Sequence, residues 1–164
     1  MSTSTTDDTT TKDLPRVDLN RVTPEIYKAM LHLNAAVERS GLEKPLLELI
    51  KVRASQINRC AYCLDMHTVD ARAGGETEQR LYTLPAWRET PFFTARERAA
   101  LEVTEAVTLI AEEGLPDDVY ARAAEQFTED ELAKLLWAVI VINAWNRVAI
   151  PTRMEPGHYH PRAR

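Results

Sequence analysis

The sequence predicts an all-α fold in a single domain with about seven helices. Apolar residues recur at offsets of three and four along most of the chain, and no stretch shows the alternation expected of strands. Residues that favour helix starts and helix ends bracket these stretches. A chain of 164 residues is also long enough to bury a core without disulfide bonds. We therefore expect one helical domain over residues 15–155.

Three helices are expected in the first half of the chain, over residues 24–40, 45–58 and 60–74. Pro24 and Pro45 each suit a first helical turn, where a missing backbone N–H costs little. Asn58 is a candidate N-cap for the third helix. Gly74 and Gly75 follow that helix and can adopt the left-handed conformation that ends it.

Four further helices are expected over residues 76–84, 94–113, 116–126 and 129–150. Two capping boxes, Thr94 with Glu97 and Thr128 with Glu131, mark helix starts where side chain and backbone satisfy each other's hydrogen bonds. Pro151 is expected to stop the last helix. The irregular connection after the first of these helices carries aromatic side chains that must pack in the core.

The last helix is apolar on almost every side between residues 135 and 145. It is long enough to span a bilayer, but lysine, asparagine and arginine interrupt the apolar run, so a buried helix fits better and no membrane association is expected. The asparagines can contact a pocket or cap carbonyls. A helix that is apolar all round must be covered all round. We expect a homo-oligomer to cover it, the alternative being a central helix wrapped by its own chain.

Composition excludes several classes of partner. Lysine and arginine number 20 against 25 acidic residues, so the net charge is -5 and no global positive field attracts nucleic acid or anionic lipid. Two cysteines do not make a secreted disulfide scaffold, and the expected compartment is the cytoplasm. Residues 1–14 are polar, without the apolar run of a leader, and are expected to form a disordered arm. Residues 156–164, with His158 and His160, are expected to form a tail with no assigned role.

Cys60, Cys63 and His67 carry the most prominent chemistry in the sequence. On an α-helix, offsets of three and four return to one face, so the two sulfurs and the imidazole form a single stripe. A helix start offers free backbone N–H groups and a favourable dipole to an anion, which helps a thiol to ionise there. The thiolate is the reactive form, and His67 places a base one turn from Cys63.

Three explanations of the cysteine pair compete. Both can be ordinary buried thiols, which are common in cores. With His67 they can supply three ligands of a tetrahedral zinc, completed by Glu48 or water, but no second ligand pair follows in the sequence. The third explanation is thiol peroxidase or dithiol-disulfide chemistry, which needs an acidic thiol, a proton carrier and a second thiol. We favour the third and expect neither a metal nor another cofactor.

Glu48 is the candidate partner of His67. It lies on the preceding helix, and the tight turn near Asn58 predicts an antiparallel helix pair that brings Glu48 close to His67. A carboxylate on one ring nitrogen would fix the tautomer of the imidazole. A solvated surface glutamate is the alternative, and periodicity does not decide between the two. A thioredoxin-type site is excluded because the pattern contains no βαβ framework.

Glu48, the segment Cys60-Ala61-Tyr62-Cys63 and His67 together resemble the signature of the alkylhydroperoxidase D-like proteins, in the carboxymuconolactone decarboxylase superfamily. The resemblance continues in residues 53–58, 71–75, 87–89 and 93–101. It covers roughly residues 25–150 of the chain.

The resemblance implies an all-helical fold that assembles as a trimer or hexamer. It assigns attack on the peroxide to Cys63, resolution of the resulting sulfenic acid to Cys60, and proton relay to His67 and Glu48. It also implies that an external dithiol, such as a lipoyl group borne by another protein, reduces the disulfide. Some family members carry histidine between the cysteines. Tyr62 occupies that place here and is expected at a pocket mouth or an interface.

The favoured function is the reduction of hydrogen peroxide or organic hydroperoxides by the dithiol. One alternative is a redox sensor or electron-relay module that is oxidised without peroxidase turnover. Another is a decarboxylase or lyase of the same superfamily, whose chemistry needs no thiol. The cysteine pair, present together with Glu48 and His67, favours the peroxidase-like branch.

Overall fold

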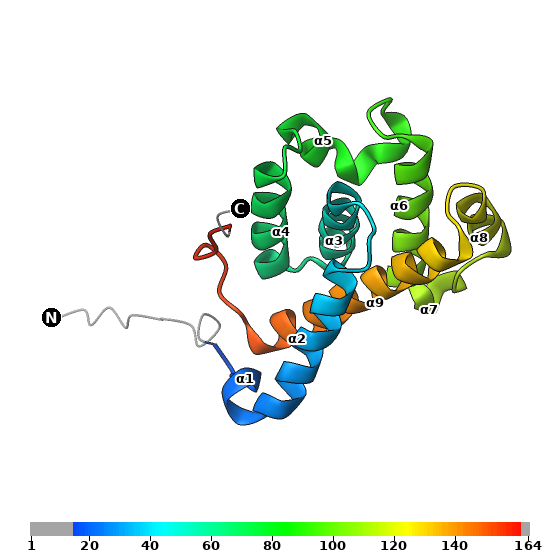
Figure 1. The fold of residues 1–164 in the computed structure, drawn as a ribbon. Helices are drawn as coiled ribbons and strands as arrows, with labels where there is room; N and C mark the ends of the chain where they lie inside the picture. Colours follow the sequence, from blue (N-terminus) through cyan, green and yellow to red (C-terminus); the bar gives the residue numbers. More distant parts are fainter. Residues whose placement is uncertain (1–14, 162–164) are drawn as a thin grey trace, which may run out of the picture.

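The structure, a computed structural model, describes residues 15–161. Over that range it contains nine α-helices, one 3₁₀ helix and no strand (Figure 1), which confirms the all-α class. The elements are α1 (Leu19–Val22), α2 (Pro24–Glu38), α3 (Lys44–Asn58), α4 (Ala61–Ala73), α5 (Glu78–Thr83), η1 (Leu84–Glu89), α6 (Ala95–Thr108), α7 (Ile110–Glu113), α8 (Asp117–Ala124) and α9 (Glu129–Thr152). The expected arm at residues 1–14 and the last residues of the expected tail, 162–164, lie outside the described range.

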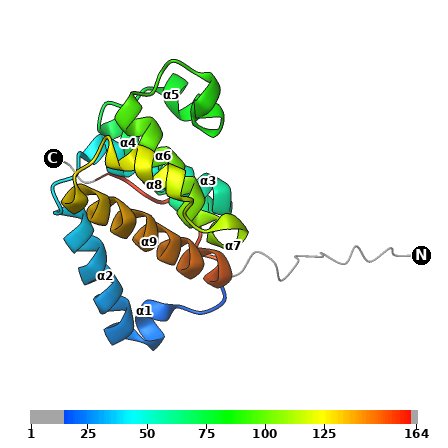
Figure 2. The same cartoon turned by 90° about the vertical axis from the view of Figure 1, so that its right-hand side faces the viewer.

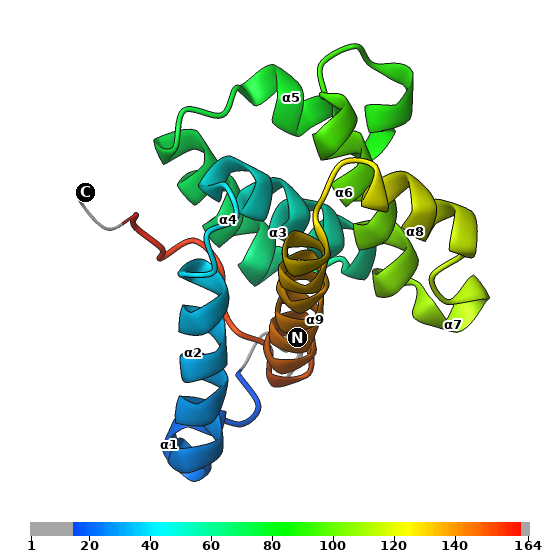
Figure 3. The same ribbon diagram turned by 45° about the vertical axis from the view of Figure 1, so that its right-hand side comes forward.

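Helix α3 lies at the centre of the fold. It packs against α4, α6 and α9, which surround it in Figure 1 and Figure 3. Eight of its 15 residues are buried, because its apolar positions face more than one neighbour. One apolar cluster joins α3 to α2, α6, α8 and α9, and a second joins it to α4, α5, η1 and α6. A side chain on α3 is therefore held firmly with respect to the cysteine helix.

Helix α9 crosses the molecule beside α2 (Figure 2) and packs on α3 and α6. By length and composition it could cross a membrane, but ten of its residues are buried within this fold, as in a core helix. Trp137 and Ile140 are nevertheless 51% and 45% exposed. Residues 15–161 therefore do not wrap α9 completely, unlike the alternative of a central helix covered by its own chain.

The boundaries differ from expectation in three places. A short helix, α1, precedes α2 and is capped by the side chain of Asp18. The helix expected over residues 94–113 is divided at Leu109 into α6 and α7, a break that an apolar period of three and four does not reveal. Pro151 lies inside the last turn of α9, which ends at Thr152. Both expected capping boxes are present, at the starts of α6 and α9.

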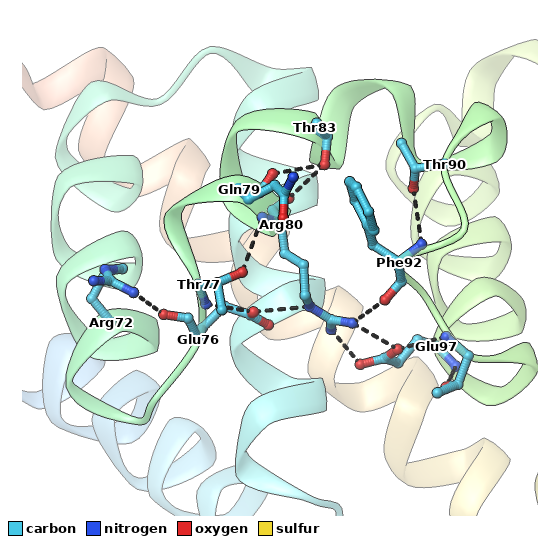
Figure 4. A network of polar contacts seen from close by, with 10 residues as sticks. Arg72, Glu76, Thr77, Gln79, Arg80, Thr83, Thr90, Phe92 and Glu97 are labelled. Atoms are coloured by element: carbon cyan, nitrogen blue, oxygen red, sulfur yellow. Dashed lines mark hydrogen bonds and ion pairs between the residues drawn. The ribbon is translucent and has the colours of Figure 1, made fainter.

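The connection between α4 and α6 is held by Arg80 and its partners (Figure 4). Arg80 Nε donates to Glu76 at 2.9 Å, Nη2 donates to Glu97 at 2.5 Å, and Nη1 donates to the carbonyl of Phe92. The guanidinium also lies 4.6 Å from the centre of the Phe93 ring. These residues, the Arg80 cluster, tie α5 to the start of α6 and hold the aromatic connection against the core.

The end of the described chain lies along α4. The backbone N–H of Gly157 donates to Asp65 at 2.8 Å, and the Tyr159 hydroxyl donates to Asp70 at 2.7 Å. Both histidines of the tail are exposed. The described part of the tail therefore packs on the helix that carries the cysteines.

Candidate active site

The cysteine helix begins at a tight corner. Helix α3 ends at Asn58, Arg59 has a left-handed backbone with φ of 57°, and Cys60 is the N-cap of α4. The prediction that Asn58 caps this helix is therefore wrong, because Asn58 still belongs to α3. The N–H of Cys60 donates to the carbonyl of Ser55 at 3.0 Å and closes the corner.

The two thiols lie together at the start of α4. Cys60 is 1% exposed and Cys63 2%, and no disulfide joins them in this structure. Cys60 Sγ accepts a hydrogen bond from the Cys63 backbone N–H at 3.4 Å. A hydrogen bond from the Cys63 thiol, aided by backbone N–H groups, lowers the pKa of Cys60 to about 7 despite burial. The same thiol-thiol hydrogen bond raises the pKa of Cys63. The pair therefore loses one proton near neutral pH and retains the other.

This order of ionisation places the first negative charge on Cys60, whereas the resemblance assigns attack to Cys63. The remaining proton lies in a hydrogen bond between the two sulfurs. A short shift of that proton moves the charge from Cys60 to Cys63. The two thiols thus ionise as a pair, with one proton shared by two sulfurs.

Side chains from α3, α4 and α9 enclose the thiols. The buried apolar members are Ala54, Ile142 and Ala149, and the partly buried ones are Tyr62, Trp145 and Met154. Tyr62 therefore packs against the apolar cluster that contains the thiols. Its own pKa is raised by burial and by the neighbouring thiols.

Asparagine side chains of α3 and α9 form a hydrogen-bonded group next to the thiols. Asn146 donates from Nδ2 to Ser55 Oγ at 3.1 Å and hydrogen-bonds to both thiols, which acts to lower both of their pKa values. Asn58 Nδ2 donates to Oδ1 of Asn146 at 2.8 Å and of Asn143 at 2.9 Å. From the sequence, Asn143 and Asn146 were expected either to contact a pocket or to cap carbonyls. One sequence feature could have indicated that these two side chains lie in a buried polar group: they are a pair of amides three residues apart in an otherwise apolar helix.

His67 is buried one turn after Cys63, and Glu48 is its partner. His67 Nδ1 and Glu48 Oε2 are 2.9 Å apart across the packed helices α3 and α4. Burial acts to raise the pKa of Glu48, but hydrogen bonding to His67 and the charge of Lys51 lower it by more. An ionised Glu48 accepts the Nδ1 proton, which leaves Nε2 of the neutral ring as a base. The alternative of a solvated surface glutamate is therefore wrong.

Lys51, expected among the polar positions of α3, is only 6% exposed. Its Nζ donates to Glu48 Oε1 at 2.8 Å and also to Glu38, the last residue of α2. Burial acts to lower the pKa of Lys51, but the two carboxylates raise it by more. Glu38, Glu48, Lys51 and His67 thus form one connected group, the relay cluster. The only sequence signal for Lys51 was its place one turn after Glu48.

A groove of about 540 Å³ opens on the outer side of the relay cluster. Its lining includes Glu38, Glu48, Asp70 and Tyr159 but neither thiol. Glu48 therefore contacts buried His67 on one side and the groove on the other. Glu38 and Glu48 of the relay cluster are therefore reachable from this groove.

Two sets of residues bear on metal binding. Glu48, His67 and Asp70 place possible ligand atoms within 4.8 Å of one another, a set different from the thiol-containing one considered from the sequence. Glu48 already contacts Lys51 Nζ and His67 Nδ1, so an added cation would face the Lys51 ammonium at close range. We therefore assign neither set as a metal site.

Comparison with known proteins places this fold and site in one family. The profile of the Carboxymuconolactone decarboxylase family matches residues 24–106, which include Glu48 and the whole cysteine helix. The chain belongs to this family. The uncharacterized protein YdfG of Bacillus subtilis (strain 168) is 44% identical over 135 residues, covering 82% of this chain and 92% of YdfG.

Solved structures agree with the assignment. A protein of unknown function from Agrobacterium tumefaciens, described as a candidate antioxidant defence protein AhpD, is 40% identical with a TM-score of 0.86, covering 89% of this chain and 100% of its own. The debrominase Bmp8, in complex with 2,3,4-tribromopyrrole, shares the fold alone, with 16% identity, a TM-score of 0.74 and coverage of 83% and 73%. The chain is an AhpD-like member of the carboxymuconolactone decarboxylase superfamily.

Proposed function

We propose that this protein is a thiol-dependent peroxidase that reduces hydrogen peroxide or organic hydroperoxides. The observation that carries the proposal is the Glu48–His67 hydrogen bond of 2.9 Å, one helical turn from a pair of thiols that loses a proton near neutral pH. A low first thiol pKa, a base and a second thiol are the parts that peroxide reduction needs. The description of the Agrobacterium relative as a candidate antioxidant defence protein points in the same direction.

In the proposed reaction, His67 takes a proton from the thiol pair at Nε2, and Glu48 stabilises the resulting imidazolium. The Cys63 thiolate attacks one peroxide oxygen, the O–O bond breaks, and the leaving alkoxide or hydroxide takes the proton from His67. Cys63 is then a sulfenic acid. His67, now neutral again, takes the proton of Cys60, the Cys60 thiolate attacks the Cys63 sulfur, the S–O bond breaks, and the leaving hydroxide takes that proton from His67 and becomes water. The disulfide has lost two electrons, which an external dithiol returns by exchange.

The two cysteines differ in their proposed roles. Cys63 attacks because it lies one turn from His67, and Cys60 resolves because the helix start stabilises its charge. Cys60→Ser should therefore accumulate a sulfenic acid on Cys63, which dimedone labelling and peptide mass spectrometry detect. In Cys63→Ser the labelling of Cys60 should be much slower. Faster labelling of Cys60 would reverse the two roles.

Turnover is the decisive test of the function. Wild-type protein should consume peroxide continuously with dihydrolipoamide as the reductant. Cys63→Ser and Cys60→Ser should each lose at least about a thousandfold in steady-state rate, because neither can complete the disulfide cycle. Equal turnover by wild type and both variants would refute the proposal.

A second candidate is a dithiol sensor or electron-relay module. The burial of both thiols under Tyr62, Trp145 and Met154 favours it, because this cover admits a small oxidant more easily than a bulky reductant. Oxidation by one equivalent of peroxide without further turnover would support this candidate. A decarboxylase or lyase of the superfamily would instead remain active after both cysteines are replaced by serine.

We also propose that the chain works as a homo-oligomer, a trimer or a hexamer. Trp137 and Ile140 on α9, with Ile26 and Leu31 on α2, are large apolar side chains exposed in the single chain. Burying them between subunits removes apolar area from water. Light scattering at low concentration should give three or six times the mass of the chain, and a monomer would contradict the proposal.

A further inference from the structure

The relay cluster contains a buried cation that the proposed reaction does not itself use. We propose that Lys51, anchored by Glu38, is a positioning residue that keeps Glu48 a carboxylate and thereby holds the proton of neutral His67 on Nδ1. The role of Lys51 in catalysis rests on the proposed function. Its effect on the protonation of Glu48 and His67 can be measured without peroxide.

The contacts make Lys51 the link between α2 and the Glu48–His67 pair. Its ammonium group bonds to one oxygen of Glu48 at 2.8 Å, while the other oxygen of Glu48 lies 2.9 Å from His67 Nδ1. The Glu38 contact holds Lys51 from the opposite side, at the end of α2. The two oxygens of the Glu48 carboxylate therefore contact different partners, Lys51 at Oε1 and His67 at Oε2.

The charges of the cluster favour proton uptake by His67. Two carboxylates and one ammonium leave a single negative charge, which protonation of His67 neutralises. A largely buried group is more stable without a net charge. Proton transfer from a thiol to His67 therefore neutralises the relay cluster.

Removing Lys51 would change which atom carries the proton. Burial alone acts to raise the pKa of Glu48, and Lys51 is one of the two groups that oppose this effect. A protonated Glu48 would donate to His67 Nδ1 and shift the ring proton to Nε2. In that tautomer Nε2 already carries a proton and cannot accept one from a thiol, so the base would be lost.

The neighbourhood contains other groups that could influence this titration. Asp70 on α4 lies within 4.8 Å of the Glu48 and His67 ligand atoms, and Tyr159 of the tail is bonded to Asp70. The thiols of α4 lie one and two turns before His67. From α9, the apolar side chains of Val141, Ile142 and Trp145 line a small cavity with His67 and Lys51. These groups are unchanged in the variants below.

Two single variants move the charge of the cluster in opposite directions. Lys51→Met removes the ammonium and should raise the titration midpoint of His67, followed by NMR of the ring nitrogens, by roughly one pH unit. Glu38→Gln removes one carboxylate and should lower the same midpoint by a similar amount. The double variant keeps only Glu48 and so restores the single negative charge, and its midpoint should return toward wild type.

The ring tautomer gives a second readout. At a pH below the midpoint, where the Glu48–His67 pair has gained one proton, wild-type His67 should be protonated on both ring nitrogens, and Lys51→Met should show a neutral ring with its proton on Nε2 in a substantial fraction, because the added proton then lies on Glu48. Lys134→Met is the matched control, because Lys134 pairs with Asp130 on the surface of α9. It should leave the midpoint and the tautomer unchanged.

Shifts of opposite sign in the two variants support the inference, and shifts of the same sign or no shift overturn it. If Lys51→Met does not fold, the downward shift in Glu38→Gln decides alone, and its absence overturns the inference. A protein that never turns over peroxide but shows the opposite shifts would refute the proposed function and leave the electrostatic role of Lys51 intact.

Discussion

The Arg80 cluster and the relay cluster contain similar charged groups but differ in their roles. In each, one partly or fully buried cation lies between two carboxylates, Glu76 and Glu97 for Arg80, and Glu38 and Glu48 for Lys51. The guanidinium of Arg80 also binds a backbone carbonyl, and arginine does not lose its proton in proteins. The relay cluster instead includes His67, which titrates near neutral pH in ordinary surroundings and is bonded through one nitrogen.

An ion cluster gains a chemical role when one of its members is a side chain suited to proton transfer, such as an imidazole. The Arg80 cluster joins segments that would otherwise separate, and its protonation does not change between pH 6 and pH 8. The relay cluster includes an imidazole, and the proposed reaction uses its proton exchange. We therefore expect mutations in the two clusters to affect different measurements.

The largest effect should come from His67→Gln. Glutamine keeps much of the side-chain volume but cannot accept the thiol proton, so the rate of peroxide reaction at neutral pH should fall about a hundredfold to ten-thousandfold. The rate should recover at alkaline pH, where hydroxide removes the proton instead. Stopped-flow measurement across pH checks both parts, and an unchanged rate at neutral pH would remove His67 from the mechanism.

Glu48→Gln should have a smaller effect on the same rate. The amide can still hydrogen-bond to His67 but carries no charge to stabilise the imidazolium, and loss of such a supporting partner costs roughly tenfold to a hundredfold. The alkaline recovery seen in His67→Gln should be weaker here, because His67 remains. A rate equal to that of wild type would show that Glu48 serves structure alone.

Arg80→Met should change stability and leave the peroxide rate of folded protein unchanged. Losing charged hydrogen bonds at a partly exposed site costs about 2 kcal/mol, or about 5 °C in Tm. Thermal and urea unfolding measure the loss. A slower reaction in fully folded protein would contradict the separation of the two clusters.

The stability loss in Arg80→Met should depend on pH. Burial acts to raise the pKa of Glu97, but Arg80 and the Thr94 backbone lower it by more. A depressed carboxyl pKa adds stability that is complete above the unfolded value, about 4.3, and is lost as pH falls through the folded value. The difference between wild type and Arg80→Met should therefore shrink below about pH 4. A constant difference down to pH 3 would show that lost packing, rather than charge, causes it.

The smallest expected effect is that of Tyr159→Phe, at the groove beside the relay cluster. The change removes only the hydroxyl that donates to Asp70 at 2.7 Å, so the loss in stability should be within about 1 kcal/mol. Turnover should stay within about twofold of wild type. A much larger loss of turnover would show that the tail takes part in the relay.

Local sequence rules predicted most of the fold and half of the site. The capping boxes at Thr94 and Thr128 gave correct helix starts because they depend on neighbours within one turn. The stripe of Cys60, Cys63 and His67 followed from helix geometry in the same way. Glu48 required a correct guess of how two helices pack, which the short corner between them allowed.

The missed features depend on contacts between distant segments. Asn58 has the character of a helix cap, but its side chain is bonded to two asparagines of α9, more than eighty residues later. Lys51 looks like a surface lysine in the sequence, and only the end of α2 explains its burial. Periodicity assigns a residue to a face of its own helix and does not say which side chain of another helix meets it.

The corner at Arg59 sets a strict limit on chain length. Glu48 and His67 are separated by 19 positions, and only two residues, Arg59 and Cys60, join the two helices that carry them. Adding one residue within α4 before His67 would rotate its imidazole by about 100° around the helix axis, away from Glu48. Insertions and deletions between these two residues should therefore abolish the contact, even where a point substitution in the same stretch is tolerated.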